Sequence, residues 1–458
     1  MAELARLRAE NEQLRARLQR LEAENARLRK DSSTSSKPPS SDIVKPPKPP
    51  TAPGRKRHIG GQPGHPRHQR AALPTTAVDR TVSYGLGQCP ACGGALTPCN
   101  EPMRVVQQFE LVAKPVVVTE HRALAFWCPH CRTTHYAALP PGVAEAGLVG
   151  PCLTACVAYL KGACHGSYTT IQTHLRDALG VSLSTGQLVK LVGKASAALA
   201  GPYQELLEQL PRQAVLNVDE TGHKDAGESY WTWCFRAALF TLFKIDPSRG
   251  SAVLLEVLGK DFDGVLGCDY FSAYRKYMKD CDILVQFYLA HLIRDVKFLL
   301  TLQDRATRRY GERLLKALRS LFGVIHRREH YTPPGFERAL DRARRRVLSV
   351  GRRAPRRAEA LNLAQRFRQH GTAYFQFITT PGIEPTNNLA ERAIRFVVID
   401  RRVTQGTRGQ AGRIWCERIW TTIATCAQQG RSVFEFLQQA VHAHLTGHPV
   451  PSLLFNTS

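Results

Sequence analysis

Two acidic side chains each follow a short apolar run in the middle of the sequence. Val215 to Val218 leads directly into Asp219, and Gly264 to Cys268 leads directly into Asp269. Apolar runs of this length predict buried strands. Strands that end at the same edge of a sheet can hold their acids within the few ångströms that a shared pair of divalent metal ions requires. A single acid after a strand usually just begins a loop, so only the pair of acids indicates a metal site.

A third acid would complete a metal site, and Glu391 lies at the predicted start of a helix. Asn388 and Glu391 also have the spacing of a capping box, in which Glu391 only returns a hydrogen bond to the helix cap. Spacing alone favours neither interpretation. Glu384 and Glu220 are the next candidates for a third ligand if Glu391 is only a capping residue.

Further elements are needed to position these acids. Tyr230 to Ile245 is an aromatic and β-branched run long enough for a hairpin strand, and Gly250 to Leu258 predicts another apolar strand. Ile283 to Tyr288 predicts a strand that runs into a helix near His291. The pair Thr221-Gly222 predicts a turn directly after the first acid-bearing strand.

Four segments that contain these residues, NVDETGH, GCDYFSAY, FYLAHLIRD and EPTNNLAERAIR, occur in this order. Together they resemble the TnpC-type transposases of the IS-sixty-six class of insertion sequences, and the resemblance covers nearly the whole chain. It implies a DDE-superfamily enzyme with an α/β RNase H-like core. Asp219, Asp269 and Glu391 would bind two Mg²⁺ or Mn²⁺ ions. His291 would contact the scissile phosphate or the leaving group, unless it is only a polar residue at a helix start.

The composition points to a polyanionic partner. The formal net charge is +25 and the pI is about 9.9, which favours nucleic acid. Because no apolar run reaches the roughly 18 residues of a membrane span, and the first thirty residues are rich in charge, we expect no membrane partner and no signal peptide. A bacterial cytoplasmic protein associated with the nucleoid is the expectation.

Four of the 13 cysteines form two CPxC pairs within residues 80–140. Two such knuckles separated by a segment expected to be β-rich, Val105 to Thr119, are typical of a closed structural Zn²⁺ site with four thiolate ligands. Cys99 and His130 are weaker rival ligands. The predicted ligands of this zinc-ribbon-like module are Cys89, Cys92, Cys128 and Cys131.

Residues 1–30 have the heptad pattern of a leucine zipper. Leucine fills every d position, and Asn11 and Asn25 occupy a positions, where paired amides favour a parallel dimer in register. All four pairs of g and following e positions have opposite charges. We therefore expect a homodimer or a higher oligomer through this coiled coil, with a single packed amphipathic helix as the alternative.

Two segments between the zipper and the predicted core are candidates for DNA contact. Residues 31–79 form a Pro/Ser/Lys-rich linker that contains a GGQPGH segment, although this segment is about as typical of a plain turn. Residues 145–205 have a helix-turn-helix outline, with one helix predicted at Tyr168 to Leu179 and a second capped by Ser184 or Thr185. This outline would also fit a helical hairpin inside a catalytic domain. The candidate DNA-binding residues are His65, Arg67 and Arg70 in the linker, and Ser184, Thr185, Gln187 and Lys190 in the helical segment.

The predicted catalytic core, residues 212–300 and 381–458, is interrupted by a basic helical insertion at residues 301–380. Residues 301–372 contain 19 Lys and Arg against 6 Asp and Glu, a surplus of +13. Such density beside a phosphotransfer site suggests a clamp on the DNA backbone. The candidate contacts are Arg345, Arg346, Arg352 and Arg353 in the insertion, and Asn388, Arg392 and Arg395 near the third acid.

The sequence thus predicts a multidomain DNA transposase that cuts and joins double-stranded DNA at the terminal inverted repeats of its element and at target DNA. Accessory proteins of the same element are possible partners. One alternative is a zinc-ribbon DNA-binding regulator with an inactive core, which would bind DNA equally well without divalent metal. Another is a nuclease of the same fold that cannot join strands.

Overall fold

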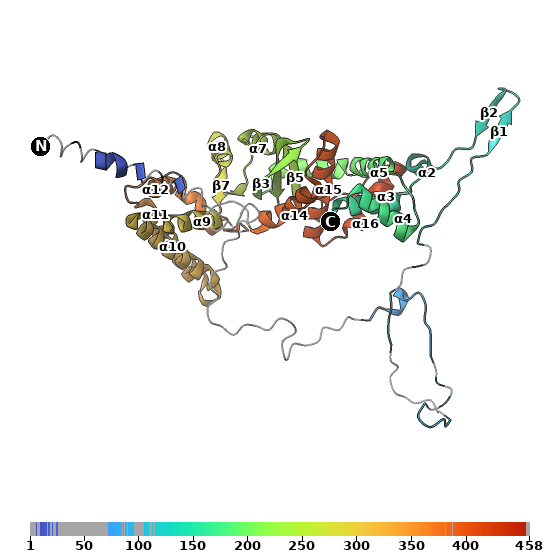
Figure 1. Ribbon diagram of the computed structural model, residues 1–458, viewed down its shortest axis with the longest axis horizontal. Coiled ribbons are helices and arrows are strands. Elements are labelled where there is room, and N and C mark those ends of the chain that lie inside the picture. The colour runs from blue at the N-terminus through green and yellow to red at the C-terminus, as the bar shows by residue number, and fades with distance from the viewer. Residues whose placement is uncertain are drawn as a thin grey trace. The chain divides into compact units, whose positions relative to one another are not determined.

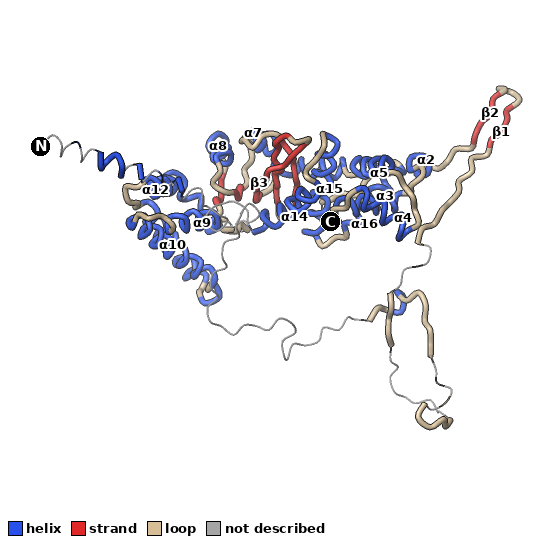
Figure 2. The backbone as a smooth tube through the Cα atoms, in the orientation of Figure 1, coloured by secondary structure: helices blue, strands red, loops and turns tan. Residues whose placement is uncertain are grey.

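The computed structural model describes residues 6, 10–15, 17–18, 21, 24–25, 72–84, 86, 88, 90–95, 105–109, 112, 115–380, 382–386 and 388–454. The chain divides into two compact units, Pro47–Glu120 and the remainder. Nearly all of the regular structure lies in the larger unit, where a mixed sheet is flanked by helices (Figures 1 and 2).

The larger unit is built on a five-stranded sheet with the order β5-β4-β3-β6-β7. Strands β5, β4 and β3 are antiparallel neighbours, whereas β3, β6 and β7 run parallel. Parallel neighbours need crossover connections, and α7 (Ser251–Leu258) and α8 (Ser272–Cys281) lie in the links that lead to β6 and β7. The strands are β3 (Val215–Asp225), β4 (Glu228–Arg236), β5 (Thr241–Asp246), β6 (Val265–Cys268) and β7 (Leu284–Phe287).

The first acid-bearing strand is longer than predicted. Thr221-Gly222 is not a turn, because β3 continues to Asp225 in register with β4. The turn follows at Ala226 and Gly227, which both have positive φ. Asp219 therefore lies inside a strand rather than at its end. Tyr230 to Ile245 likewise forms most of two strands, β4 and β5, instead of one.

The prediction of a strand at Gly250 to Leu258 is wrong, since this segment forms α7. Its buried residues, Val253, Leu254, Val257 and Leu258, recur at helical spacing, while Leu255 between them is 40% exposed. A short apolar run does not distinguish a buried strand from a buried helix by itself. The predicted strand at Ile283 to Tyr288 is present as β7.

Helix α15 (Gln410–Gln429) covers the edge strand β5. The backbone N–H groups of Thr241, Phe243 and Ile245 donate to side chains of this helix, namely Oγ1 of Thr425, Oγ1 of Thr421 and Oε1 of Glu417. These three acceptors recur every four residues, so they form one face of the helix. The helix thus provides acceptors for backbone N–H groups of the edge strand, which would otherwise lack hydrogen-bond partners.

Residues 301–372 are mainly helical, as predicted, and α10 packs against α9, α11 and α12. Helix α14 begins where the third predicted acid lies and packs on β3 and β4. The helices after β7 are α9 (Leu289–Leu300), α10 (Arg305–His326), α11 (Pro333–Arg352), α12 (Ala358–His370), α13 (Gln376–Thr379), α14 (Asn388–Thr404) and α16 (Val433–Thr446), with short 3-10 turns at Arg328–His330 and Gly371–Tyr374.

The helices before the sheet gather with α16 (Figure 1). They are α2 (Pro141–Ala146), α3 (Pro151–Gly162), α4 (Tyr168–Leu179), α5 (Thr185–Ala198) and α6 (Ala200–Gln209), followed by a 3-10 turn at Leu210–Arg212. The stretch Pro141–Gly162 is long and apolar enough to span a membrane by composition alone, which is weak evidence. Its helix α3 buries Ala155, Val157 and Ala158 and packs against α5 and α16, as a core helix does.

Little regular structure is described before α2. Strands β1 (Ala125–Cys128) and β2 (Thr133–Tyr136) pair in a hairpin, and Thr75–Ala77 forms a 3-10 turn. The predicted β-rich segment Val105 to Thr119 contains no strand among its described residues. Every described residue between 6 and 25 is helical and exposed. Pairing of this helix as a coiled coil stays a prediction.

Candidate active site

Strands β3 and β6 bring Asp219 and Asp269 level with each other. The two strands are parallel, and Asn217 pairs with Gly267 in their register. Each acid lies two residues further along its own strand direction, so both belong to the same level of the sheet. Asp269 follows the end of β6, where its Oδ1 accepts a hydrogen bond of 2.8 Å from the backbone N–H of Phe271. The sheet register thus juxtaposes the two acids.

Negative charge accumulates around Asp219. Burial raises the pKa of this carboxyl well above its ordinary value, and the neighbouring carboxylates of Glu220, Asp269 and Glu391 raise it further. The backbone N–H of Glu220 donates to Oδ1 of Asp219 at 2.9 Å, which offsets only part of this effect. An ionised Asp219 therefore needs a nearby cation, and carboxylate oxygens are the ligands that Mg²⁺ prefers.

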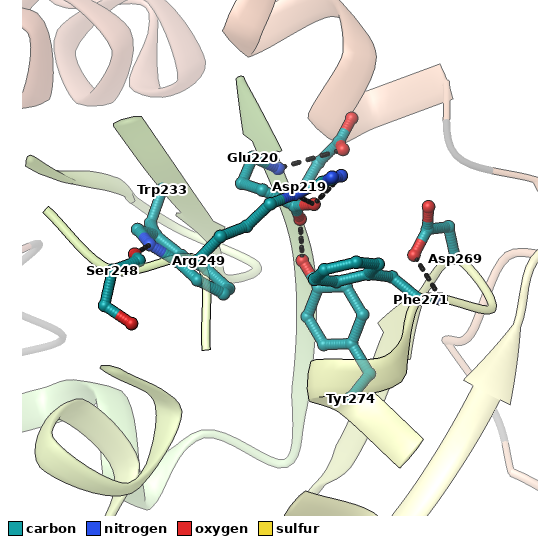
Figure 3. Close-up of polar contacts among 8 residues, drawn as sticks. All are labelled: Asp219, Glu220, Trp233, Ser248, Arg249, Asp269, Phe271 and Tyr274. Atoms are coloured by element: carbon teal, nitrogen blue, oxygen red, sulfur yellow. Dashed lines mark hydrogen bonds and ion pairs between the residues drawn. The ribbon is translucent and has the colours of Figure 1, made fainter. Parts of the chain in front are cut away.

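Glu220 points into a different environment from its neighbour (Figure 3). Its Oε1 accepts hydrogen bonds from Nε and Nη2 of Arg249 at 2.9 and 2.6 Å, and its Oε2 accepts one from the hydroxyl of Tyr274. Only 2% of the Glu220 side chain is exposed. Burial and the nearby Asp269 raise its pKa. Because both of its oxygens already have partners, Glu220 is a poor candidate for the third metal ligand.

Glu391 lies in the first turn of α14, as predicted, and its carboxylate is held by α9. Nη2 of Arg294 lies 3.0 Å from Oε1 of Glu391, and Nε2 of His291 lies 3.7 Å from the same oxygen. The neighbouring His291 and Arg294 lower the pKa of Glu391. The structure thus brings two predicted catalytic residues together. The side chain of Asn388 is outside the described residues, so the capping box stays untested.

Within the described residues, no group of three or more His, Cys, Asp or Glu side chains is close enough to hold a metal ion as the side chains lie. Asp219 and Asp269 face the same region, whereas Glu391 is engaged by Arg294. Glu384, the other reserve candidate, is exposed. The roles of all these acids in metal binding remain predictions.

A cleft of ≈ 170 Å³ opens beside Asp269. The buried His291 lines it together with Asp295, which accepts a hydrogen bond of 2.6 Å from Nη1 of Arg366. Arg366 comes from α12, inside the predicted insertion, so the insertion contributes directly to the wall of this cleft. The lining residues are Asp269, Tyr270, Phe271, Tyr288, His291, Leu292, Asp295, Arg366 and Tyr374.

Tyr288 also fixes the sheet next to the acids. Its hydroxyl donates to Oδ1 of Asn217 at 2.9 Å, across Gly267. A Cβ at position 267 would lie 2.8 Å from both of these atoms. Glycine is therefore required at this position, two residues before Asp269, because the tyrosine and asparagine occupy the space of a side chain.

The predicted zinc ligands are only partly described. Cys89 lies outside the described residues, as does the rival Cys99, and Cys92 belongs to the smaller unit. Cys128 ends β1, and Cys131 lies in the turn before β2. Hydrogen bonds from Cys131 lower the pKa of the Cys128 thiol. Sγ of Cys131 also lies 3.2 Å from Nε2 of His135. The four-cysteine site stays a prediction from the sequence.

Comparison with protein-family models decides the relationship. The model of the transposase IS66 family matches residues 146–413, which is more than half of the 458 residues. The chain belongs to this family. The model of the zinc-finger binding domain of transposase IS66 matches residues 87–132, which include all four predicted zinc ligands of this IS66-family chain. A family of unknown function matches residues 1–71. No curated protein matches the chain.

The predicted DNA-binding residues of this IS66-family chain are mostly exposed where they are described. Oγ of Ser184 caps α5 by accepting a hydrogen bond of 3.1 Å from the N–H of Gln187, as predicted for the helix start. His65, Arg67 and Arg70 lie outside the described residues. The exposed candidates are Ser184, Thr185, Lys190, Arg345, Arg346, Arg352, Arg353, Arg392 and Arg395. Their contact with DNA remains a prediction.

Three residues near the acids were not found from the sequence: Arg249, Tyr274 and Arg294. Arg294 did carry a signal, because it lies three residues after His291 and therefore on the same face of a predicted helix. Tyr274 stood in the aromatic cluster after Asp269, without an indicated partner. Arg249 lies in a loop whose local sequence indicates no role. Only the tertiary structure brings it to Glu220.

Proposed function

We propose that the chain is a DDE-type DNA transposase, which cuts DNA at the ends of its insertion sequence and transfers the strands to a target. The observation that carries this proposal is the parallel register of β3 and β6, which places Asp219 level with Asp269. The strand order, with three antiparallel strands followed by two parallel ones, supports an RNase H-like core. Membership of the IS66 transposase family supports the same chemistry.

The acids fit divalent metal ions by their chemistry. Asp219 and Asp269 would hold Mg²⁺ or Mn²⁺, and the family resemblance assigns Glu391 as the third ligand. The crowding of carboxylates that raises the pKa of Asp219 is the charge distribution that a bound cation relieves. When bound, two such ions activate water or a 3′-OH for in-line attack on a phosphodiester and stabilise the leaving oxygen.

The residues around the acids hold and orient the DNA. His291 lines the cleft beside Asp269, where its ring can donate a hydrogen bond to the scissile phosphate or the leaving oxygen. Arg392 and Arg395 continue the helix that begins near Glu391, and both are exposed. The exposed arginines of α11, Arg345, Arg346 and Arg352, add positive charge on the insertion, where they would clamp the phosphate backbone.

The remaining segments recognise and pair the ends of the element. The zinc-finger domain, with one structural Zn²⁺ per chain, and the α4–α5 segment would bind the terminal inverted repeats in double-stranded DNA. Leu14, Leu18 and Leu21 are 59, 57 and 55% exposed, as unpaired zipper positions would be. A parallel coiled coil of two chains would hold two ends together. We place the protein in the bacterial cytoplasm with the nucleoid, with accessory proteins of the element as further partners.

A strand-transfer assay on the element's own terminal repeats tests this function. The full-length protein should nick the repeat and join it to a target duplex with Mg²⁺ or Mn²⁺, and it should do neither in EDTA. Asp219→Asn and Asp269→Asn should bind the repeat and cut nothing. A parent protein that binds the repeat tightly but never nicks it with either metal would overturn the proposal.

One observation favours a second candidate, a DNA-binding regulator with an inactive core. Glu391 is engaged by Arg294, and the described residues contain no preassembled group of three metal ligands. A regulator would bind the repeat with equal affinity in EDTA and in Mg²⁺, and both Asp variants would behave like the parent in every assay. A nuclease would instead release nicked DNA without any joined product.

A further inference from the structure

Arg249 occupies a rigid loop between β5 and α7. The N–H of Ser248 donates to Oδ1 of Asp246 at 2.7 Å, and the N–H of Gly250 donates to Oγ of Ser248 at 2.9 Å. The indole N–H of the buried Trp233 donates to the carbonyl of Ser248 at 3.1 Å (Figure 3). These bonds fix the backbone on both sides of Arg249, so its side chain leaves the loop in a defined direction.

The guanidinium of Arg249 is held on two aromatic rings. Its Cζ lies 3.9 Å from the ring centroid of Phe271 and 4.4 Å from that of Trp231. Nε and Nη2 both donate to Glu220, as described above. Figure 3 shows the long side chain reaching across to Glu220 above the ring of Phe271. Stacking combined with a charge-assisted fork gives an arginine one fixed orientation.

One edge of the Arg249 guanidinium is not used by the contacts with Glu220. Nη1 makes no hydrogen bond with any residue that the structure describes, while Nε and Nη2 are both used. The Arg249 side chain is 37% exposed, although its partner Glu220 is only 2% exposed. An arginine that served only to neutralise a buried carboxylate would have no need of an open edge. The arrangement presents a preoriented positive donor to solvent.

This donor lies where the segments of the two acids meet. Glu220 directly follows Asp219 and donates its backbone N–H to it. Phe271 caps Asp269 through its own backbone N–H. Arg249 contacts the side chains of both neighbours, Glu220 and Phe271, and so joins the end of β6 to β3.

We propose that Arg249 binds a phosphate of the DNA strand beside Asp219 and Asp269, with Glu220, Trp231 and Phe271 holding it in place. The proposal rests on the proposed function, because it takes DNA as the ligand of this site. A phosphodiester oxygen suits the open edge, since guanidinium nitrogens bind phosphate oxygens through short charge-assisted hydrogen bonds. Arg249 is then a strand-positioning residue that sequence patterns do not reveal.

A double variant separates phosphate binding from a purely structural ion pair. Glu220→Gln combined with Arg249→Gln removes both charges, so no buried carboxylate is left without a partner. We would measure its affinity for a duplex carrying the terminal repeat, in EDTA, over a series of salt concentrations. Loss of one charge-assisted contact should weaken binding about tenfold. The slope of log K against the logarithm of the salt concentration should become less steep by about one unit, as expected for one lost phosphate contact.

Lys276→Gln is the matched control. It removes one exposed cation from α8, which pairs with Asp280 at the surface, and leaves the stack around Arg249 intact. Its affinity and salt slope should stay within about twofold of the parent, as surface pairs contribute little. A double variant that binds the duplex as tightly as the parent, with the same salt slope, would overturn the proposal and leave a structural ion pair.

Arg249→Lys covers the case in which the double variant does not fold. Lysine keeps a positive charge opposite Glu220, but it has a single nitrogen. Arginine can bind Glu220 through one edge of its guanidinium and the phosphate through another. It should show the same loss of affinity, and parental binding would contradict the proposal. Because binding is measured in EDTA, failure of the parent to cut DNA would count against the transposase function alone. Normal cutting with unchanged binding by the Arg249 variants would count against this inference alone.

Discussion

Arg294 on α9 holds the carboxylate of Glu391 on α14, with its Nη2 3.0 Å from Oε1. This contact spans 97 positions of sequence and joins the helix after β7 to the helix that carries the third predicted acid. The pair keeps Glu391 ionised and in place next to His291, which lines the cleft, although it also occupies one carboxylate oxygen. A metal ion would therefore compete with Arg294 for Glu391.

Glu391→Gln tests whether this acid acts in the reaction. The change removes the charge and nearly keeps the volume, so cleavage should fall at least about 100-fold while DNA binding persists, as expected when a group that stabilises transition-state charge is lost. Cleavage of a labelled terminal-repeat duplex in Mg²⁺, with affinity measured in parallel, provides the readout.

Arg294→Gln is the companion variant, since it removes the partner and leaves the acid. If Glu391 is a metal ligand, this variant should keep measurable cleavage and need less Mg²⁺ for half-maximal activity. If Glu391 serves only as a capping residue, Glu391→Gln can still serve the cap. An active and stable Glu391→Gln protein would then send the search for a third ligand elsewhere.

Asp219→Asn should stabilise the metal-free protein at neutral pH. The folded-state pKa of Asp219 is raised well above its ordinary value, so its contribution to stability is fully present below the unfolded pKa and is lost as pH rises through the folded one. Asparagine removes this loss. Thermal unfolding in EDTA at pH 7 should show a melting temperature at least about 2 °C higher than the parent.

Mg²⁺ should reverse that order. Ligand binding to the native state stabilises the parent in proportion to its affinity, so millimolar Mg²⁺ should raise the melting temperature of the parent and leave Asp219→Asn unchanged. Equal responses of the two proteins to Mg²⁺, or a less stable variant in EDTA, would mean that Asp219 is not held as a crowded carboxylate at a metal site.

The sequence predicted the elements whose periodicity was unambiguous. The helix at Tyr168–Leu179 agrees with the structure to the residue, and Ser184 is the cap of the two candidates, Ser184 and Thr185, because an amphipathic pattern and a hydrogen-bonding cap are local signals. The strand predicted at Gly250 to Leu258 was wrong because a short, mostly apolar run fits a buried strand as well as a buried helix. The predicted end of β3 was wrong because pairing with β4 overrides the turn preference of Thr221-Gly222.

The candidate site divides in the same way. Asp219 and Asp269 could be proposed from sequence because each follows an apolar run, and the parallel register of their strands explains why they meet. The residues that surround these two acids could not be predicted from the sequence. Arg249 reaches Glu220 across 29 positions, and the bond from Arg366 to Asp295 joins the insertion to the core across 71. Contacts of this kind depend on tertiary packing and leave no local pattern.

Cys92→Ser tests the zinc site. The parent should contain one Zn²⁺ per chain by elemental analysis, as four thiolates in two CxxC knuckles bind zinc tightly. The variant should lose most of it, and binding of the terminal repeat should weaken because the fold of such modules is coupled to the metal.

Cys152→Ser is the control for this change. Cys152 is an exposed cysteine on α3, outside the residues that match the zinc-finger model. Its substitution should leave the zinc content and DNA affinity at parental values. The predicted zinc site would be contradicted if the purified parent protein contained no zinc, or if the Cys92→Ser protein still contained one Zn²⁺ per chain.

Removal of residues 1–30 tests the zipper. The truncated protein should bind a single terminal repeat like the parent, but it should pair two repeats much less efficiently, because the exposed leucines of this helix lose their partner chain. Asn11→Leu combined with Asn25→Leu should keep the association and broaden the range of oligomers. A full-length protein that sediments as a monomer at micromolar concentration would exclude the zipper.

His223 lies near the C-terminal end of β3 and is only 3% exposed. The loop after α14 is anchored at this end of the strand. Thr407 donates its hydroxyl to Oδ1 of Asp225 at 2.7 Å, so it accepts from Nε2–H of His223 at 3.0 Å. Nδ1 of His223 is buried and has no partner among the described residues. A proton on Nδ1 would find no acceptor, and burial, with the nearby Arg401, lowers the pKa of His223 to about 4.

This lowered pKa predicts acid sensitivity of the fold. The neutral ring favours the native state, so the contribution is fully present above the unfolded pKa of 6.5 and is lost as pH falls toward the folded pKa of about 4. Lowering the pH from 7 to 5 should cost about 2 kcal/mol of unfolding free energy through this residue. His223→Gln keeps a donor for Thr407 and cannot titrate, so it should lose that part of the pH dependence. Urea unfolding can be followed through Trp420, whose ring lies 6.1 Å from His223. Equal pH dependence in both proteins would show that His223 is protonated as easily when folded as when unfolded.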